Sequence, residues 1–164
     1  MYQRILVALG EDDAINEKVV AEATAISRVT KGTLNLLSVF FPRNLETPES
    51  GSTDRMLSDV TTETFQLFMS DWSILQPTSQ EFARDRGDRF SVQGITVEWT
   101  QAVGEPGRQI CNIAKDWKAD LIMLGLRQRI GFEEFLLGSV SNYVMHHAPC
   151  SVMTVQEVGE AVLV

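Results

Sequence analysis

The stretch that decides the fold is residues 119–155, ADLIMLGLRQRIGFEEFLLGSVSNYVMHHAPCSVMTV. An apolar run at residues 121–124 ends on Gly125, and a polar loop with two arginines follows. Gly138 and Ser139 then open an amphipathic segment, and a second apolar run closes the stretch. This order predicts a strand, a glycine loop, a helix and a strand. The N-terminus of such a helix presents free N–H groups and a positive dipole end, which stabilise anions and above all phosphate.

Five apolar runs of this kind alternate with helical patterns along the chain. The first, second and fourth are almost continuously apolar, which is typical of central strands in a parallel sheet covered on both faces. The third alternates with polar residues and is expected nearer an edge, and the fifth is also expected at an edge. The expected strands are residues 4–9, 33–40, 95–100, 120–125 and 150–155.

Helix signals lie between these runs. Asp12 and Asp13 precede an apolar stripe at helical spacing, and Pro106 suits the first position of a helix. The expected helices are residues 14–29, closed by Gly32, residues 54–75, residues 106–117, and a last helix that opens at Gly138 or Ser139 and ends before Pro149. A loop is expected at residues 42–53, and a solvated segment of mixed charge at residues 76–93. The alternation predicts an α/β fold in one domain, residues 1–164: a doubly wound, five-stranded parallel sheet with helices on both faces.

The composition narrows the range of partners. Asp and Glu number 22 against 14 Lys and Arg, a formal net charge of -8. Nucleic acid and acidic membranes attract basic surfaces, so this balance argues against both, whereas a small anionic ligand needs only a few local positive groups. No apolar run approaches the roughly 18 residues that span a bilayer, and we expect a cytoplasmic protein. Cys111 and Cys150 show no metal-binding spacing and are expected to be buried thiols.

The predicted topology also predicts where a ligand binds. In open α/β sheets, ligands bind beyond the carboxyl ends of the strands, where the strand order reverses. The loops at residues 8–13 and 125–141 are expected to flank that crevice. Gly125 would either take a positive φ or let a ribose or phosphate pack closely, and the helix start at Gly138 would hold phosphate oxygens. The residues alone leave an alternative open, in which Gly125 is a turn glycine and Ser139 a helix cap.

The spacing Gly125-x2-Gln128-x9-Gly138-Ser139 resembles the Gly-x2-Gly-x9-Gly-(Ser/Thr) signature of the nucleotide-binding universal stress proteins. The resemblance extends over essentially the whole chain. It includes the opening strand at residues 2–9, the segment Val-Gly-Glu-Pro at residues 103–106, the fourth strand at residues 119–125, and the closing helix and strand at residues 136–152.

This resemblance implies a Rossmann-like sheet, commonly dimeric, that in one branch of the family binds ATP. Transferred to this chain, it implies that the first loop and the second strand contact the adenine. The glycine loop would surround the ribose and phosphates, and the start of the last helix would bind the end of the phosphate chain. ADP and AMP stay open as ligands, and so does an accompanying Mg²⁺ ion. The implied nucleotide-binding positions are Ala8, Leu9, Gly10, Val39, Gly125, Arg127, Gln128, Arg129, Gly131, Gly138, Ser139, Val140 and Ser141.

Two positions depart from the family pattern. Gly10 stands where the family usually has Asp after the first strand, and Gln128 replaces the second signature glycine. Substitution of Asp12 or Asp13 for the missing carboxylate is one interpretation, and capping of the helix by these residues is the one we favour. If a positive φ is needed at Gln128, the side chain costs roughly 1 kcal/mol or more. Both departures predict weaker binding or a different nucleotide.

We compare three possible functions for this chain. The first is a nucleotide-binding module that regulates stress survival, with no evident catalytic set and at most slow ATP hydrolysis. The second is an interaction scaffold without nucleotide, which would dimerise through the edge strand at residues 150–156 and the C-terminal tail. The third, a phospho-acceptor receiver domain, lacks an Asp after the third strand, where Thr100-Gln101-Ala102 stand. A P-loop enzyme lacks its Gly-x4-Gly-Lys-(Ser/Thr) motif.

Overall fold

The computed structural model describes residues 1–41, 94–126 and 138–156. The loop predicted at residues 42–53, the helix at residues 54–75 and the charged segment at residues 76–93 lie outside these ranges. The described elements are β1 (Arg4–Leu9), α1 (Asp13–Thr30), β2 (Thr33–Phe40), β3 (Thr96–Val103), α4 (Pro106–Asp116), β4 (Leu121–Leu126), α5 (Ser139–His147) and β5 (Ser151–Gln156).

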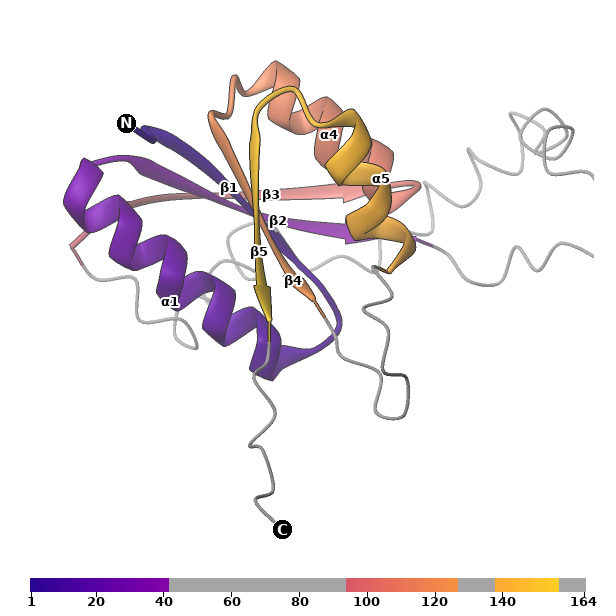
Figure 1. Cartoon of the computed structure of the whole chain (residues 1–164), viewed down its shortest axis with the longest axis horizontal. Helices are drawn as coiled ribbons and strands as arrows, with labels where there is room; N and C mark the ends of the chain where they lie inside the picture. Colours follow the sequence, from indigo (N-terminus) through magenta and orange to yellow (C-terminus); the bar gives the residue numbers. More distant parts are fainter. Residues whose placement is uncertain (42–93, 127–137, 157–164) are drawn as a thin grey trace, which may run out of the picture.

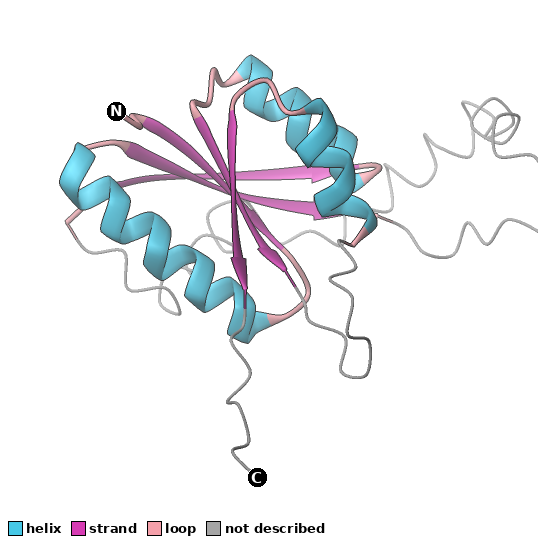
Figure 2. Cartoon of the chain, viewed as in Figure 1, coloured by secondary structure: helices cyan, strands magenta, loops and turns pink. Residues whose placement is uncertain are grey.

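The five strands form one parallel sheet in the order β3-β2-β1-β4-β5. Helix α1 covers one face, and α4 and α5 lie side by side over the other (Figure 1). Figure 2 shows the same layering, with the strands fanned by their twist between the two sets of helices. The predicted α/β fold is therefore confirmed, and so are the edge positions predicted for β3 and β5. No described helix is long and apolar enough to cross a membrane.

Each face of the sheet has its own hydrophobic core, because successive strand residues point to opposite faces. The core under α1 contains Val7 of β1, Leu36 of β2 and Met123 of β4, packed on Val19 of the helix. The core under α4 and α5 is built in the same way. Its fully or nearly buried members are Leu6, Leu37, Ile110, Cys111, Ala114, Ile122, Leu124 and Val144.

Several predicted boundaries need correction. Strand β3 continues three residues beyond the predicted end at residue 100, because its ladder with β2 extends to the pair Phe40↔Val103. Strands β4 and β5 each begin and end one residue later than predicted. The left-handed residue that ends α1 is Lys31, with φ 57°, and not Gly32. Gly32 is needed for another reason, since a Cβ there would lie 3.0 Å from the carbonyl oxygen of Gln3.

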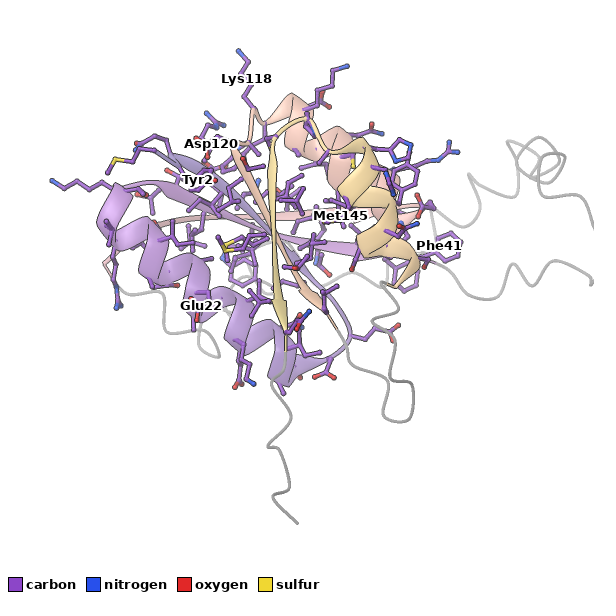
Figure 3. The ribbon with its side chains drawn as sticks, viewed as in Figure 1. Tyr2, Glu22, Phe41, Lys118, Asp120 and Met145 are labelled. Carbon is purple, nitrogen blue, oxygen red and sulfur yellow. The ribbon has the colours of Figure 1, made fainter. Side chains whose placement is uncertain are left out.

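The amino edge of the sheet is fastened by Asp120, the residue that precedes β4. Its carboxylate accepts hydrogen bonds from the backbone N–H of Gln3 at 2.7 Å and of Arg4 at 3.1 Å. Its own N–H donates to the carbonyl oxygen of Arg4 at 2.9 Å. Figure 3 labels Asp120 at this edge, near Tyr2. These three bonds extend the β1–β4 pairing toward the amino ends of the strands, beyond the first residue pair Ile5↔Leu121.

We expect Asp120→Ala to lower the free energy of unfolding by about 1–2 kcal/mol, because two strand N–H groups lose their carboxylate partner. Urea denaturation followed by circular dichroism measures this change. Asp116→Ala is the matched control, since Asp116 is an exposed residue at the end of α4. Equal stability of the two variants would show that the Asp120 bonds contribute nothing.

Candidate ligand-binding site

The strand order reverses between β1 and β4. From β1 the chain proceeds outward to β2 and β3, and it then crosses to the other side of β1 to form β4 and β5. Connections on the two sides use opposite faces, so β1 is followed by α1 on one face of the sheet and β4 by α5 on the other. The two predicted loops therefore begin at neighbouring strands, as expected, although 115 residues separate Gly10 from Gly125 in the sequence.

The loop after β1 is held by a residue that the sequence analysis did not single out. The side chain of Asn16, in the first turns of α1, is only 2% exposed. Its Oδ1 accepts from the N–H of Gly10 at 2.8 Å, and its Nδ2 donates to the Gly10 carbonyl at 2.9 Å. Asp12 caps the helix by accepting from the N–H groups of Ala14 and Ile15. The capping interpretation of Asp12 is thus confirmed.

The N-terminus of α5 lies on the other side of the reversal. Its N-cap is Gly138, which supplies no side-chain cap hydrogen bond. The other two described helices differ, because Asp12 caps α1 and Glu105 caps α4 through carboxylates. Ser139 is the first residue of the helix and is not its cap, so the capping alternative for Ser139 is wrong. At α5, the positive end of the helix dipole has no cap carboxylate beside it.

Gly138 is not a glycine that the fold demands. Its φ of -58° and ψ of 158° are open to any residue. A Cβ placed on it would have no other heavy atom within 4 Å. The absence of a side chain leaves the backbone at the helix start approachable, which is what a phosphate group needs.

A rim of half-buried apolar side chains lies at the same edge, on the α4 and α5 face. It comprises Ala8 of β1, Val39 of β2, Ala102 of β3 and Val140 of α5, all packed on the core of that face. Ala102 was missed by the sequence analysis, because the predicted third strand stopped at residue 100. Ala102 pairs with Val39 in the ladder between β2 and β3, and this pairing is what places Ala102 beside a predicted site residue.

Other predicted site residues are placed differently. The side chain of Leu9 is 8% exposed and belongs to the core under α1, on the opposite face from the rim. Ser139 is exposed, whereas Ser141 is only 7% exposed. Gly10 is exposed and joins the site through the loop backbone. The remaining predicted residues, Arg127, Gln128, Arg129 and Gly131, lie outside the described part of the chain.

Gly125 lies inside β4, where it pairs with Val155 of β5. Its φ is not positive, so that part of the prediction is wrong. A Cβ on Gly125 would lie 2.0 Å from Cγ2 of Ile15 and 3.4 Å from Cγ2 of Val19. Close packing of β4 against α1 therefore explains this glycine without a ligand.

The cysteines and histidines supply no reactive group to this edge. Cys111 is buried and Cys150 half-buried, and burial raises the pKa of each thiol above its ordinary value. His146 and His147 occupy the last turn of α5, at the end opposite Gly138. His147 stacks on Tyr143 at 4.0 Å between ring centroids, and its Nδ1 lies 2.8 Å from the Tyr143 carbonyl oxygen.

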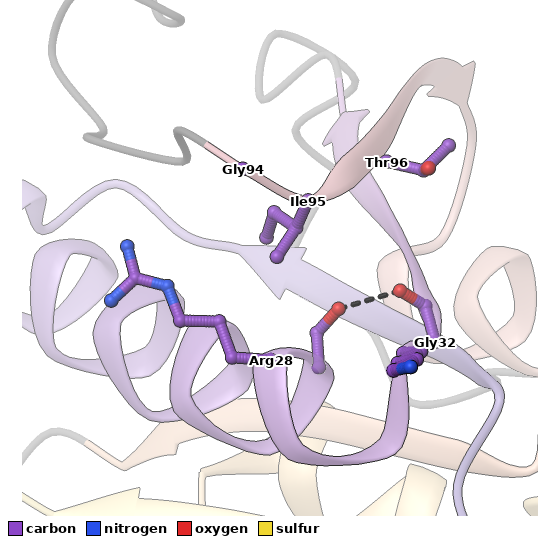
Figure 4. A pocket seen from close by; sticks show the side chains of 7 residues that line it. Arg28, Gly32, Gly94, Ile95 and Thr96 are labelled. Atoms are coloured by element: carbon purple, nitrogen blue, oxygen red, sulfur yellow. Dashed lines mark hydrogen bonds between the residues drawn. The ribbon is translucent and has the colours of Figure 1, made fainter.

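A pocket also exists at the opposite, amino edge of the sheet (Figure 4). It lies where α1 ends and β3 begins, and the Ser27 hydroxyl donates to the Gly32 carbonyl at 2.6 Å beside it. The C-terminal end of a helix is the negative end of its dipole, which disfavours anions. Its lining residues are Ser27, Arg28, Lys31, Gly32, Gly94, Ile95 and Thr96.

Comparison with known proteins identifies the family. The sequence model of the universal stress protein family matches residues 1–156. This chain belongs to the universal stress protein family. It is 33% identical over 155 residues to universal stress protein Sll1388 of Synechocystis, an alignment that covers 94% of this chain and 98% of that protein.

Solved structures of universal stress proteins share the fold. UspA from Lactobacillus plantarum superimposes with a TM-score of 0.60 at 23% identity, over 94% of this chain and 97% of that one. A universal stress protein in complex with cAMP gives a TM-score of 0.56 at 20% identity, over 94% and 96% of the two chains. The Rossmann-like α/β architecture of this universal stress protein is therefore the architecture of its family.

In this universal stress protein, Gly125→Ala should lower the free energy of unfolding by about 1–3 kcal/mol, because the added methyl overlaps Ile15. Ile15→Leu removes the offending Cγ2 at nearly constant volume. We therefore expect the double variant to recover part of the loss, measured by urea denaturation relative to Ile15→Leu alone. If the single variant Gly125→Ala were as stable as the wild type, close helix packing would not be the reason for this glycine.

Proposed function

We propose that this universal stress protein binds an adenine nucleotide at the carboxyl edge of the sheet, between β1 and β4, as a regulatory module in stress survival. The observation that carries the proposal is the N-terminus of α5, which begins at an approachable glycine without a carboxylate cap. The apolar rim of Ala8, Val39, Ala102 and Val140 lies at the same edge and suits the faces of a flat base. A ligand with both an apolar base and an anionic phosphate matches the two features together.

The phosphate end is assigned to residues 138–141. The first N–H groups of a helix have no partner within it, and here the earliest backbone bond of α5 runs from the N–H of Asn142 to the Gly138 carbonyl. The N–H groups of Ser139, Val140 and Ser141 are thus the donors proposed for phosphate oxygens, with the exposed Ser139 hydroxyl beside them. The cAMP complex of a protein of the same fold supports a phosphate-bearing adenine ligand.

The proposed ligands are ATP, ADP and AMP. A Mg²⁺ ion would accompany a triphosphate chiefly through the phosphate oxygens. We assign no protein ligand to it, and we assign Asp12 to the N-cap of α1, where its Oδ1 accepts two N–H groups. In the described ranges, no group of three His, Cys, Asp or Glu side chains is arranged to hold a metal ion.

We propose binding rather than catalysis as the activity. Both histidines lie at the far end of α5 from the proposed phosphate site. Among the described residues of the carboxyl edge we find no paired nucleophile and base to which a hydrolytic step can be assigned. A bound nucleotide would act by changing the surface that the protein presents to a partner.

The proposal predicts opposite effects of Gly138→Asp on stability and on binding. Asp is a better N-cap than Gly, and open space surrounds the position, so the melting temperature should stay equal or rise by about 1–3 °C. The new carboxylate would occupy the same N–H groups and repel a phosphate, so the affinity for ATP or AMP should fall about tenfold or more. Differential scanning calorimetry and isothermal titration calorimetry measure the two effects.

Two further variants make this test specific. Gly138→Asn adds a cap of equal size without charge and should weaken nucleotide binding less than Gly138→Asp does. Gly94→Asn adds the same side chain at the amino edge, where space is also open. Its φ of +84° is strained for any side chain, and Asn adopts positive φ more often than most residues. Gly94→Asn should leave the affinity unchanged. Undiminished binding by Gly138→Asp would exclude this helix end as the phosphate site.

We further propose a homodimer formed through β5. This strand lies at the edge of the sheet, and Met153 on it is 37% exposed. Its neighbours Val152 and Val155 are only half-buried. An edge strand of this character presents unpaired backbone groups and apolar side chains to a second copy.

Light scattering at micromolar concentration should then give twice the chain mass of 18.3 kDa. Met153→Lys places a charge on the edge and should shift the mass toward the monomer. Val29→Lys is the matched control, since Val29 is a 75% exposed apolar residue on α1. A monomeric wild-type protein would contradict the proposed interface.

A further inference from the structure

We infer that Asn16 is a positioning residue of the nucleotide site, holding the loop after β1 in its binding conformation before the ligand arrives. This inference rests on the proposed function, since a positioning role needs a ligand at the carboxyl edge. It adds a residue that no signature motif contains and that contacts the ligand only through the loop that it holds.

The strand ladder of β1 stops just before Gly10. Strand β1 pairs with β2 as far as Leu9↔Ser38 and with β4 as far as Ala8↔Leu124. Gly10 is the next residue and has no ladder partner. The Asn16 amide supplies one, because it accepts from the Gly10 N–H and donates to the Gly10 carbonyl, at 2.8 and 2.9 Å. Both backbone groups of Gly10 are thereby fixed by a single side chain.

Asn16 is a buried polar residue within a helix. It is 2% exposed, and its backbone N–H donates to the Asp12 carbonyl at 3.0 Å, so its main chain belongs to the first turn of α1. Asn is a poor residue for a helix, and burying its amide is costly unless both ends are bonded. The two bonds to Gly10 meet that requirement.

The loop that Asn16 holds presents a bare backbone at Gly10. Gly10 is exposed, and a Cβ on it would meet no heavy atom within 4 Å. The space at Gly10 is therefore open at the strand-order reversal, next to Ala8 of the apolar rim. A loop that is already ordered loses less conformational freedom when a ligand binds, and this raises affinity. By ordering the loop in advance, Asn16 offsets part of the affinity lost because Gly10 stands where the family usually has Asp.

The test compares Asn16→Ala, which removes both bonds, with Asn16→Asp, which keeps an acceptor for the Gly10 N–H and loses the donor. The control is Thr24→Val on the same helix, because Thr24 is 5% exposed and its Oγ1 has no hydrogen-bond partner within residues 1–41, 94–126 and 138–156. Affinities for ATP and AMP are measured by calorimetry at a temperature where each variant is fully folded. Global destabilisation then does not change the result.

We expect about a tenfold loss of nucleotide affinity in Asn16→Ala and none in Thr24→Val. The loss in Asn16→Asp should be at least as large, because its second carboxylate oxygen faces the Gly10 carbonyl oxygen where the amide donated. Amide hydrogen exchange should show faster exchange at Gly10 in Asn16→Ala, with Leu6 and Val7 unchanged. Should Asn16→Ala fail to fold, Asn16→Asp alone decides, through its affinity and its exchange at Gly10.

Two outcomes would overturn the inference, and they differ in whether the proposed function survives. Equal affinity of the wild type and the Asn16 variants, with faster exchange at Gly10, would remove the positioning role and leave the proposed function standing. Failure of the wild-type protein to bind either nucleotide would remove both. Protection of the Gly10 amide would then still show that the Asn16 bonds exist in solution.

Discussion

The structure depends on one constraint, which is that all five strands run parallel. A parallel pair needs a crossover connection over one face of the sheet, and such crossovers are right-handed. The connection from β1 to β2 leads toward one edge of the sheet, and it therefore places α1 on one face. The connections from β3 to β4 and from β4 to β5 lead toward the other edge, and they place α4 and α5 on the opposite face. The carboxyl ends of β1 and β4 are left between these layers. The candidate site exists because the strand order reverses there.

The first turn of α1 connects the two sides of that reversal. Ile15 packs against the bare backbone of Gly125 in β4, and its neighbour Asn16 bonds to Gly10 after β1. Asp12 caps the same turn. A single helical turn thus sets the distance between β4 and the helix and also the conformation of the β1 loop. The position of Gly138 at the start of α5 is set separately, by the packing of α5 on α4 through Tyr143 and Gly107.

The sequence predicted the architecture well because apolar runs and capping residues are local signals. Strands β1 and β2 were predicted with their observed bounds, and Pro106 marked the start of α4. The roles of particular glycines were harder to predict, because they depend on contacts far away in sequence. Gly125 has the family spacing, yet it packs on Ile15, and the hydrogen bonds of Asn16 to Gly10 appear only once the helix is folded back on the strand. Ala102 was missed because strand register with β2 is not visible in a single run of residues.

The central claim is that an adenine nucleotide binds at the carboxyl edge of the sheet, between β1 and β4. Titration of ¹⁵N-labelled protein with ATP, followed by amide chemical shifts, tests it most directly. The account predicts saturable shifts at Gly10, Val39 and residues 138–141, with Gly32 and Gly94 of the amino edge unaffected. Saturable shifts confined to the amino edge, or none at any ATP concentration up to the millimolar range, would contradict it.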